Sequence, residues 1–248
     1  MELKTRRPNC MESELPTFKH NVAITGLTAA GKTTHSHITI KEFGFGYVSA
    51  STILREKAGL TGEPSADFWL SPKGQALTQK IIELGIDEAL RDKEEASEFT
   101  IFDCRSLPWL TRRPILSIWL ESSLESRVYK AIVSHGESEK RSFDEIRREI
   151  AAKDERDRGN LLRAFGFDLL NDWEPLDVVI DISDFIEAPS CKASWKSIQL
   201  AQDIISVVVG LYLDDDDFYR IRLNKLRKIF GHSIFKHFSK RYLQILDN

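Results

Sequence analysis

Residues 21–36, NVAITGLTAAGKTTHS, combine a short apolar segment, a turn bracketed by glycines and the start of a helix. Within this stretch, GLTAAGKT at 26–33 fits G-x-x-x-x-G-K-[ST], the spacing of a loop that cradles phosphate groups. Gly26 and Gly31 allow the backbone to turn tightly, so that successive N–H groups point at an anion. The stretch therefore predicts an α/β fold with a triphosphate site.

The side chains of this loop have separate expected roles. Lys32 is expected to reach the β- and γ-phosphate oxygens and to act in catalysis, while Thr33 offers its hydroxyl to Mg²⁺. ATP and Mg²⁺ are therefore the expected cofactors. The residues expected to bind ATP are Gly26, Thr28, Ala29, Ala30, Gly31, Lys32, Thr33 and Thr34.

The composition of the 248-residue chain is that of an ordinary globular protein, with 42% hydrophobic and 29% charged residues and a net charge of −3. This charge gives no argument for a nucleic-acid or membrane partner. Three scattered cysteines form neither a disulfide framework nor a zinc motif, which favours a reducing compartment. The polar N-terminus has no secretory signal, and the longest apolar run, 204–213, is short for a membrane span. We therefore expect a cytoplasmic protein.

Apolar segments alternate with helical ones along most of the chain, which predicts a five-stranded parallel sheet with helices on both faces. The expected strands are 22–25, 47–49, 99–103, 114–120 and 177–181. The expected helices are 32–43, one starting at 51, 71–94, 122–134 and 195–213. Together with the loop at 26–33, this is the pattern of a P-loop NTPase fold.

Other P-loop classes require motifs that this sequence lacks. It has no N-K-x-D for guanine, and Cys104 follows Asp103 where a motor ATPase carries Asp-Glu. A small-molecule kinase remains, and arginines are the natural ligands of a phosphorylated acceptor because a guanidinium binds phosphate with two parallel hydrogen bonds. Arg55, Arg105 and the charged segment 137–158, with Arg127 just before it, could supply them. Solvent-exposed surface charge is the alternative for each.

Several segments then match a known family in order and spacing: VSASTILR at 48–55, IFDCR at 101–105, LESR at 124–127, KDERDR at 153–158, FGFD at 165–168 and LDVVID at 176–181. This order resembles the cytidylate kinases, which are nucleoside monophosphate kinases, and is most similar to their short archaeal-type branch. The resemblance covers about residues 20–185. It implies helical insertions for the acceptor, at about 50–95, and for a lid, at about 127–165.

The resemblance implies ATP-dependent phosphorylation of a pyrimidine nucleoside monophosphate, CMP-like, dCMP-like or modified, to the diphosphate. It implies that Arg55 and Arg105 hold the acceptor phosphate, with Asp157 at the sugar hydroxyls. Arg127 and Arg156 would be catalytic residues near the transferring phosphate. Further expected ligands are Ser49 and Ser51 for the acceptor, and Asp103 beside Thr33 for the metal.

The lid departs from the family pattern at two arginines. Lys153 stands at the first position of the lid signature and Asn160 at its last position, and the family has an arginine at each. In the family, the arginine at the last position helps to recognise the nucleotide. Lys130 also replaces an arginine that follows Arg127. Lysine does not reproduce the bidentate hydrogen bonds of a guanidinium. These changes therefore leave open which base the acceptor nucleotide carries.

The chain divides into an expected flexible leader at 1–19, a P-loop kinase domain at 20–213 and a basic helical extension at 214–248. Residues 218–248 contain eight Lys or Arg against one Asp, with apolar residues at helical spacing. A helix packed on the domain or on a second subunit is the simpler interpretation, and a surface for an acidic partner is the alternative. A monomer and a homodimer both stay open.

Two other functions remain possible from the residues alone. A kinase of a hydroxyl-bearing small molecule would need a general base, which Asp103 could provide. A nucleotide-binding regulatory module would bind ATP with little turnover.

Overall fold

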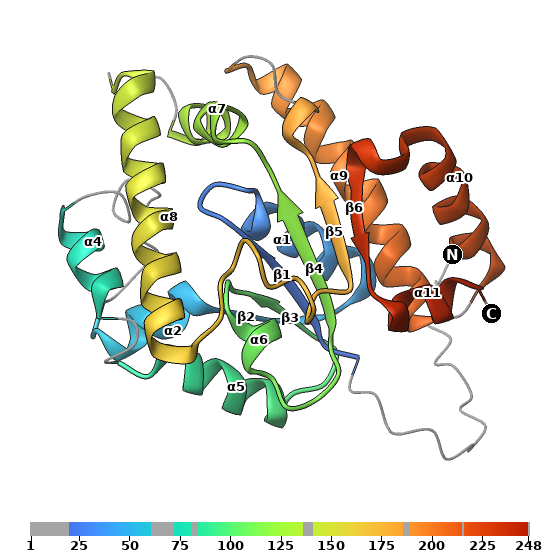
Figure 1. Cartoon of the computed structure of the whole chain (residues 1–248), viewed down its shortest axis with the longest axis horizontal. Coiled ribbons are helices and arrows are strands. Elements are labelled where there is room, and N and C mark those ends of the chain that lie inside the picture. The colour runs from blue at the N-terminus through green and yellow to red at the C-terminus, as the bar shows by residue number, and fades with distance from the viewer. Residues whose placement is uncertain are drawn as a thin grey trace, which may run out of the picture.

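A computed structural model describes residues 20–60, 72–80, 84–135, 141–185, 189–214 and 216–247. The predicted leader at 1–19 lies outside these residues. The P-loop α/β fold is confirmed: a central sheet is flanked by helices on both faces (Figure 1).

The described sheet has six strands in the order β2-β3-β1-β4-β5-β6, rather than the five predicted. The first five are parallel, and β6 runs antiparallel to β5. The phosphate-binding loop leaves β1 at the centre of the sheet, between β3 and β4. The strands are β1 Val22–Gly26, β2 Gly46–Ser49, β3 Thr100–Asp103, β4 Leu116–Glu121, β5 Val178–Asp181 and β6 Phe235–Phe238.

The described helices are α1 Lys32–Phe43, α2 Ala50–Lys57, α4 Pro72–Gln79, α5 Ile86–Ala96, α6 Leu107–Leu110, α7 Leu124–His135, α8 Phe143–Phe165, α9 Cys191–Leu213, α10 Asp217–Ile234 and α11 Lys240–Asp247. The single helix predicted at 71–94 is therefore wrong, since α4 and α5 are separate. Gly85 precedes α5 with φ 59°, a left-handed conformation that breaks a continuous helix.

Alternation along β1 divides the core into two sides of the sheet. Val22 and Ile24 face the cluster that includes α9, whereas Ala23 faces the cluster of α2 and α5. Successive residues of a strand point to opposite faces, so a short apolar strand such as VAITG is buried on both sides. This buried strand holds the phosphate-binding loop rigidly at its carboxyl end.

Helix α9 contains a segment, Ser194–Leu213, that is long and apolar enough to cross a membrane by length and composition. More than half of that segment is buried inside the protein. Its apolar side chains pack against the sheet in the largest core cluster, as in a core helix of an α/β domain.

The C-terminal extension is not wholly helical, so this part of the prediction is wrong. Phe235–Phe238 forms β6, after Gly231 leaves the helical conformation at φ 48° and ψ −139°. Backbone groups at the edge of β5 gain partners in this way, which helical spacing in the sequence does not reveal. Arg241 then pairs with the buried carboxylate of Asp177, and the Tyr242 hydroxyl donates to Val208 O at 2.8 Å. The extension is thus packed on the domain.

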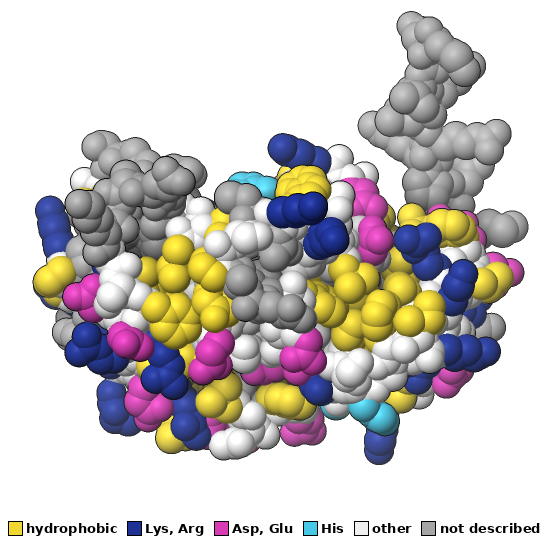
Figure 2. All heavy atoms as spheres, turned by 90° about the horizontal axis from the view of Figure 1, so that it is seen from above, with side chains coloured by type: hydrophobic (Ala, Val, Ile, Leu, Met, Phe, Trp, Pro, Cys, Tyr) yellow, Lys and Arg dark blue, Asp and Glu magenta, His cyan; other side chains and the backbone are white. Residues whose placement is uncertain are grey.

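The outer side of α10 exposes the side chains of Phe218, Ile221 and Ile229. From above, basic and hydrophobic side chains lie side by side at the right-hand end of the molecule, where the C-terminal elements are (Figure 2). Acidic side chains are interspersed among them, so this face has no patch of a single charge.

Candidate active site

The loop between β1 and α1 has the backbone geometry of a phosphate cradle. Gly26 adopts φ 143°, and a Cβ there would lie 2.6 Å from Leu120 O, so only glycine fits without displacing backbone. Gly31 adopts φ 103° and directly precedes α1. The loop therefore leads into a helix N-terminus, whose free N–H groups and dipole favour an anion.

Lys32 extends along this loop rather than into solvent. Its Nζ donates to Leu27 O at 2.8 Å. Burial, together with the charge of Arg105, lowers the pKa of Lys32 to about 8, although Asp103 and Asp154 oppose the shift. A phosphate group beside Nζ would favour the charged form and reverse this shift.

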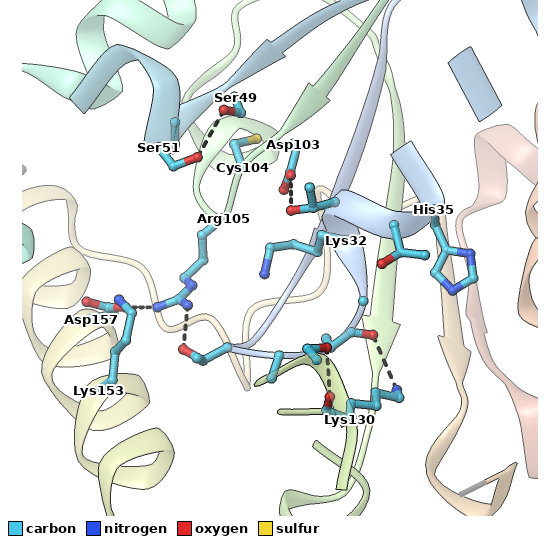
Figure 3. A pocket seen from close by; sticks show the side chains of 18 of the residues that line it. Lys32, His35, Ser49, Ser51, Asp103, Cys104, Arg105, Lys130, Lys153 and Asp157 are labelled. Carbon is cyan, nitrogen blue, oxygen red and sulfur yellow. Dashed lines mark hydrogen bonds and ion pairs between the residues drawn. The ribbon is translucent and has the colours of Figure 1, made fainter. Parts of the chain in front are cut away.

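The two predicted metal ligands lie together. Thr33 Oγ1 donates to Asp103 Oδ2 at 2.6 Å (Figure 3). The Tyr47 hydroxyl donates to the same oxygen at 3.0 Å. A hydroxyl beside a carboxylate is a set of hard oxygen donors, which suits Mg²⁺ completed by phosphate and water. Among the described residues no cluster of three or more His, Cys, Asp and Glu could hold a metal alone.

Helix α1 is anchored beneath the loop by buried polar contacts. The His35 ring lies against Gly31, and its Nδ1 donates to Gln202 Oε1 on α9 at 3.1 Å. The Gln202 amide donates in turn to Thr39 Oγ1 at 3.1 Å. Burial lowers the pKa of His35 to about 4, so the ring is neutral at physiological pH. These contacts position α1 without adding charge at the phosphate site.

Arg105 crosses from the end of β3 toward both the loop and α8. Its NH2 donates to Thr28 Oγ1 at 3.0 Å, and its NH1 pairs with Asp157 (Figure 3). Lys153 Nζ reaches the same Asp157 carboxylate at 2.8 Å. Burial and the charge of Arg105 hold the pKa of Lys153 well below its usual value. Arg105 and Lys153 thus share the carboxylate of Asp157, between the phosphate-binding loop and α8.

Residues Ser49 to Arg55 form the other side of the site. Ser49 caps α2 by accepting from Thr52 N at 3.0 Å, and its hydroxyl also lies 3.0 Å from that of Ser51. Arg55 NH2 donates to Thr52 Oγ1 at 2.9 Å. The cap fixes the start of α2, and Arg55 lies six residues after Ser49 on the same helix.

Arg127 lies under the loop. Its NH1 donates to Thr28 O at 2.9 Å and pairs with Asp154, whose other oxygen accepts from Thr28 N at 3.0 Å. Burial opposes ionisation of Asp154, but Arg105 and Arg127 outweigh it and lower the pKa of this carboxyl. Arg156 is half-buried on α8. The described lining of the cavity includes neither arginine, so their catalytic roles stay predictions.

One cavity of about 600 Å³ connects these parts. It runs from the loop and Lys32, past Asp103 and Arg105, to the α2 side. The predicted site residues that line it are Thr28, Ala29, Ala30, Gly31, Lys32, Thr33, Thr34, Ser49, Ser51, Arg55, Asp103, Arg105 and Asp157. Donor-side and acceptor-side residues from distant segments therefore face a common space.

Three contacts in this site were not predicted from the sequence. Tyr47 holds Asp103, and its place at the start of the second strand carried no signal of that contact. Asp154 lies inside the KDERDR segment, where alternating charges hide which carboxylate turns inward. Lys130 lines the cavity and donates to Ala30 O at 3.4 Å, and burial beside Arg127 lowers its pKa to about 7.

The side chain of Cys104, the residue after β3, is packed in the core beside Leu107. Burial raises the pKa of its thiol, which leaves it protonated. It is therefore a packed small residue rather than a reactive thiol.

Comparison with known proteins finds relatives that cover about two thirds of this chain. The cytidylate kinase of Pyrobaculum aerophilum is 26% identical over 163 residues, which cover 65% of this chain and 83% of that protein. The cytidylate kinase of Methanocorpusculum labreanum is 28% identical over 166 residues, covering 66% and 88%. The chain is similar to archaeal cytidylate kinases. No family model matches it.

The fold is also supported by comparison with a solved structure. An uncharacterized protein from Eubacterium ventriosum superposes with a TM-score of 0.52 at 13% identity, covering 77% of this chain and 98% of that one. At this identity the likeness shows the fold alone. The cytidylate kinase relatives cover about two thirds of the chain.

Proposed function

We propose that this chain transfers the γ-phosphoryl group of ATP to the phosphate of a pyrimidine nucleoside monophosphate. The acceptor would be CMP, dCMP or a modified nucleotide of that kind. The observation that carries the proposal is the single cavity that joins Lys32 to Arg55 and Arg105. The similarity to cytidylate kinases supports the same reaction.

The reaction needs positioning and neutralisation of charge rather than a side-chain nucleophile. An oxygen of the acceptor phosphate is already anionic and can attack the γ-phosphorus in line. Lys32 would neutralise the β- and γ-phosphates, while Arg55 and Arg105 hold the acceptor phosphate against its own repulsion. For Arg105 to do so, phosphate oxygens take over contacts that Asp157 makes in the free protein, and Asp157 turns to the sugar hydroxyls.

Thr33 and Asp103 would hold Mg²⁺, which supplies charge neutralisation of the phosphate oxygens when bound. Tyr47 keeps the Asp103 carboxylate oriented toward Thr33. Helices α7 and α8 would act as the lid that excludes water, with Arg127 and Arg156 near the transferring group.

Phosphorylation of a hydroxyl-bearing molecule is the second candidate, with Asp103 as general base. Asp103 Oδ2 accepts from both Thr33 and Tyr47, an arrangement that suits a metal site better than a base facing an acceptor hydroxyl. Two arginines beside the α2 side of the cavity also favour an anionic acceptor. A regulatory module that binds ATP without turnover is the third.

A coupled assay of ADP formation separates the three. CMP, dCMP and UMP are compared with cytidine, which offers the same base and sugar but only hydroxyls. We expect CMP or dCMP to stimulate ADP formation at least tenfold over the rate with ATP alone, and cytidine to have no effect. Stimulation by cytidine would favour the hydroxyl kinase. ATP binding without stimulation by any acceptor would favour the regulatory module.

A further inference from the structure

Helix α10 is apolar on two opposite sides. On the inner side, Leu223 is buried in the core cluster that contains α9, and Phe230 packs against that cluster. On the outer side, Phe218, Ile221 and Ile229 are 61%, 68% and 60% exposed. A helix that covers one side of a domain usually turns charged and polar residues outward. The outer apolar residues are therefore not accounted for by the packing of α10 on the domain.

Cations lie among these outer apolar residues. Phe218, Ile221, Lys225 and Ile229 follow one another at spacings of three, four and four residues, so they form one row along the helix. Because each residue advances about 100° around a helix, the exposed cations at 222 and 228 border this row on its two sides. The α10 surface consists of these exposed residues: Phe218, Ile221, Arg222, Lys225, Lys228 and Ile229.

The cations of the α10 surface have few acidic neighbours. Residues 218–246 contain no Asp or Glu. Arg222 lies 3.7 Å from Asp203 on α9, and both side chains are about half exposed, so this ion pair is weak. Within the part of the chain that the structure describes, Lys225 and Lys228 form no ion pair. The positive charge of this surface is therefore available to a partner.

The acidic residues at the start of α10 are engaged with the helix itself. Asp216 caps it by accepting from Phe218 N at 2.8 Å, and Asp217 pairs with Arg220 at 2.7 Å. Both acidic residues lie at or before the first turn. The cations beyond that turn therefore set the sign of the α10 surface.

We propose that the α10 surface binds the surface of an anionic lipid bilayer. Its apolar side chains enter the boundary between headgroups and acyl chains, while its cations meet the lipid phosphates. Lys225, inside the apolar row, reaches the headgroups because its long stem can lie along apolar surface. Exposed apolar side chains with a cationic border match both layers of that boundary.

The position of α10 suits peripheral binding. The helix forms the right-hand edge of the molecule, whereas α8 lies at the left-hand edge (Figure 1). A bilayer on the α10 surface therefore leaves α8 free to move.

Two other occupants fit the α10 surface less well. Two copies of α10 packed antiparallel about a two-fold axis at Lys225 would set the cations of one copy against those of the other. Nucleic acid would match the cations, but isoleucine offers no flat ring on which a base can stack. An anionic bilayer accounts for both the charge and the apolar row.

The charge is tested by flotation of the full chain with lipid vesicles. Vesicles of phosphatidylcholine alone are compared with vesicles that also contain phosphatidylglycerol, at low and at high salt. We expect binding to the anionic vesicles to be at least about tenfold tighter, and to weaken with salt. Lys225→Gln/Lys228→Gln should lower it about 25-fold, at about fivefold for each cation. Lys41→Gln/Lys93→Gln, which removes two exposed cations from α1 and α5, should stay within about threefold.

The apolar row is tested by Ile221→Ser/Ile229→Ser. This change should lower binding to anionic vesicles about tenfold at either salt concentration, because the loss of apolar insertion is not screened. All four substituted positions on α10 are exposed, so melting curves should match that of the wild type. ADP formation in solution should also be unchanged in these variants, because the α10 surface does not line the cavity.

Failure to bind anionic vesicles overturns the proposal, as does an equal loss of binding in Lys41→Gln/Lys93→Gln. Binding that neither α10 variant weakens places the contact elsewhere and also overturns it. Two further measurements distinguish the other occupants. If the vesicles are not bound, a single-stranded RNA oligonucleotide bound through Lys225 and Lys228 would make this a nucleic-acid surface. A dimer in light scattering that Ile221→Ser/Ile229→Ser dissociates would make it a subunit interface.

Discussion

The half of the cavity proposed to bind ATP, the donor half, and the half proposed to bind the phosphate acceptor, the acceptor half, are built in different ways. The donor half is one continuous loop, residues 26–33, whose shape follows from its glycines and from the strand and helix on either side. The acceptor half is assembled from α2, α5, the end of β3 and α8, and two of its cations, Arg105 and Lys153, are already paired with the carboxylate of Asp157. A loop of fixed shape binds phosphate directly, whereas a paired arginine must exchange partners first.

This difference predicts where substitutions act. Changes in the donor half should impair phosphoryl transfer itself. Changes in the acceptor half should act mainly on use of the acceptor, because its cations bind only that substrate.

The largest expected effect is that of Lys32→Ala. Removing the ammonium from the β- and γ-phosphates should lower kcat about 1000-fold, the upper range for loss of one group that stabilises the transition state. Steady-state ADP formation with saturating CMP measures it. Lys41→Ala, an exposed change on the same helix, should stay within twofold of the wild type. A similar loss in both variants would mean that the helix, rather than the ammonium, was damaged.

The next effect is that of Arg105→Lys. Lysine keeps the charge but cannot make two parallel hydrogen bonds, so kcat/KM for the acceptor should fall about 100-fold. The KM for ATP should change by less than about threefold. Arg112→Lys, at an exposed position between α6 and β4, is the matched control. An equal loss of affinity for ATP would instead place Arg105 in the donor half.

Arg55→Ala should raise the KM for the acceptor about tenfold and leave kcat within about threefold, because Arg55 would bind the acceptor phosphate alike in the ground and transition states. Initial rates over a range of CMP concentrations measure this split. Lys93→Ala on the neighbouring helix α5 serves as the exposed control. Unchanged acceptor kinetics would show that the acceptor site has been misplaced.

The smallest effect is proton uptake on binding ATP. The pKa values of Lys32, about 8, and Lys130, about 7, lie below the usual value of 10.5, so both are partly deprotonated in the free protein at pH 7–8. A bound triphosphate favours the charged forms and raises both pKa values, so binding should take up about half a proton at pH 7 and more than one at pH 8.

Calorimetric titration of Mg²⁺-ATP in two buffers of different ionisation enthalpy measures this uptake. Lys32→Ala should lower the uptake at pH 8 by about half a proton, because a group with a pKa of about 8 is half deprotonated there. Proton release on binding would contradict the assignment of these two lysines to the donor half.

The donor half could be predicted from the sequence because its contacts are local. Gly26, Gly31, Lys32 and Thr33 follow the spacing of a phosphate-cradling loop, and the structure places them together. The order of strands and helices was predictable for the same reason. Apolar periodicity reports burial along each segment.

The acceptor half was less predictable because its contacts join distant segments. That Arg105 meets Asp157, or that Asp87 meets Ser106, depends on how helices pack, which no local spacing records. Strand β6 was missed for a similar reason, since its conformation depends on the free edge of β5. The resemblance to a known family made up for part of this gap, because the order of its arginines relates residues that lie far apart in the sequence.

In the proposed reaction a phosphate, rather than a hydroxyl or water, receives the γ-phosphoryl group. The most direct measurement follows the label from ATP labelled at the γ-phosphate in the presence of CMP and Mg²⁺. We expect the label to appear in CDP, at its terminal phosphate, in step with ADP formation. Label found only as inorganic phosphate, or left in ATP while ATP binds, would contradict it.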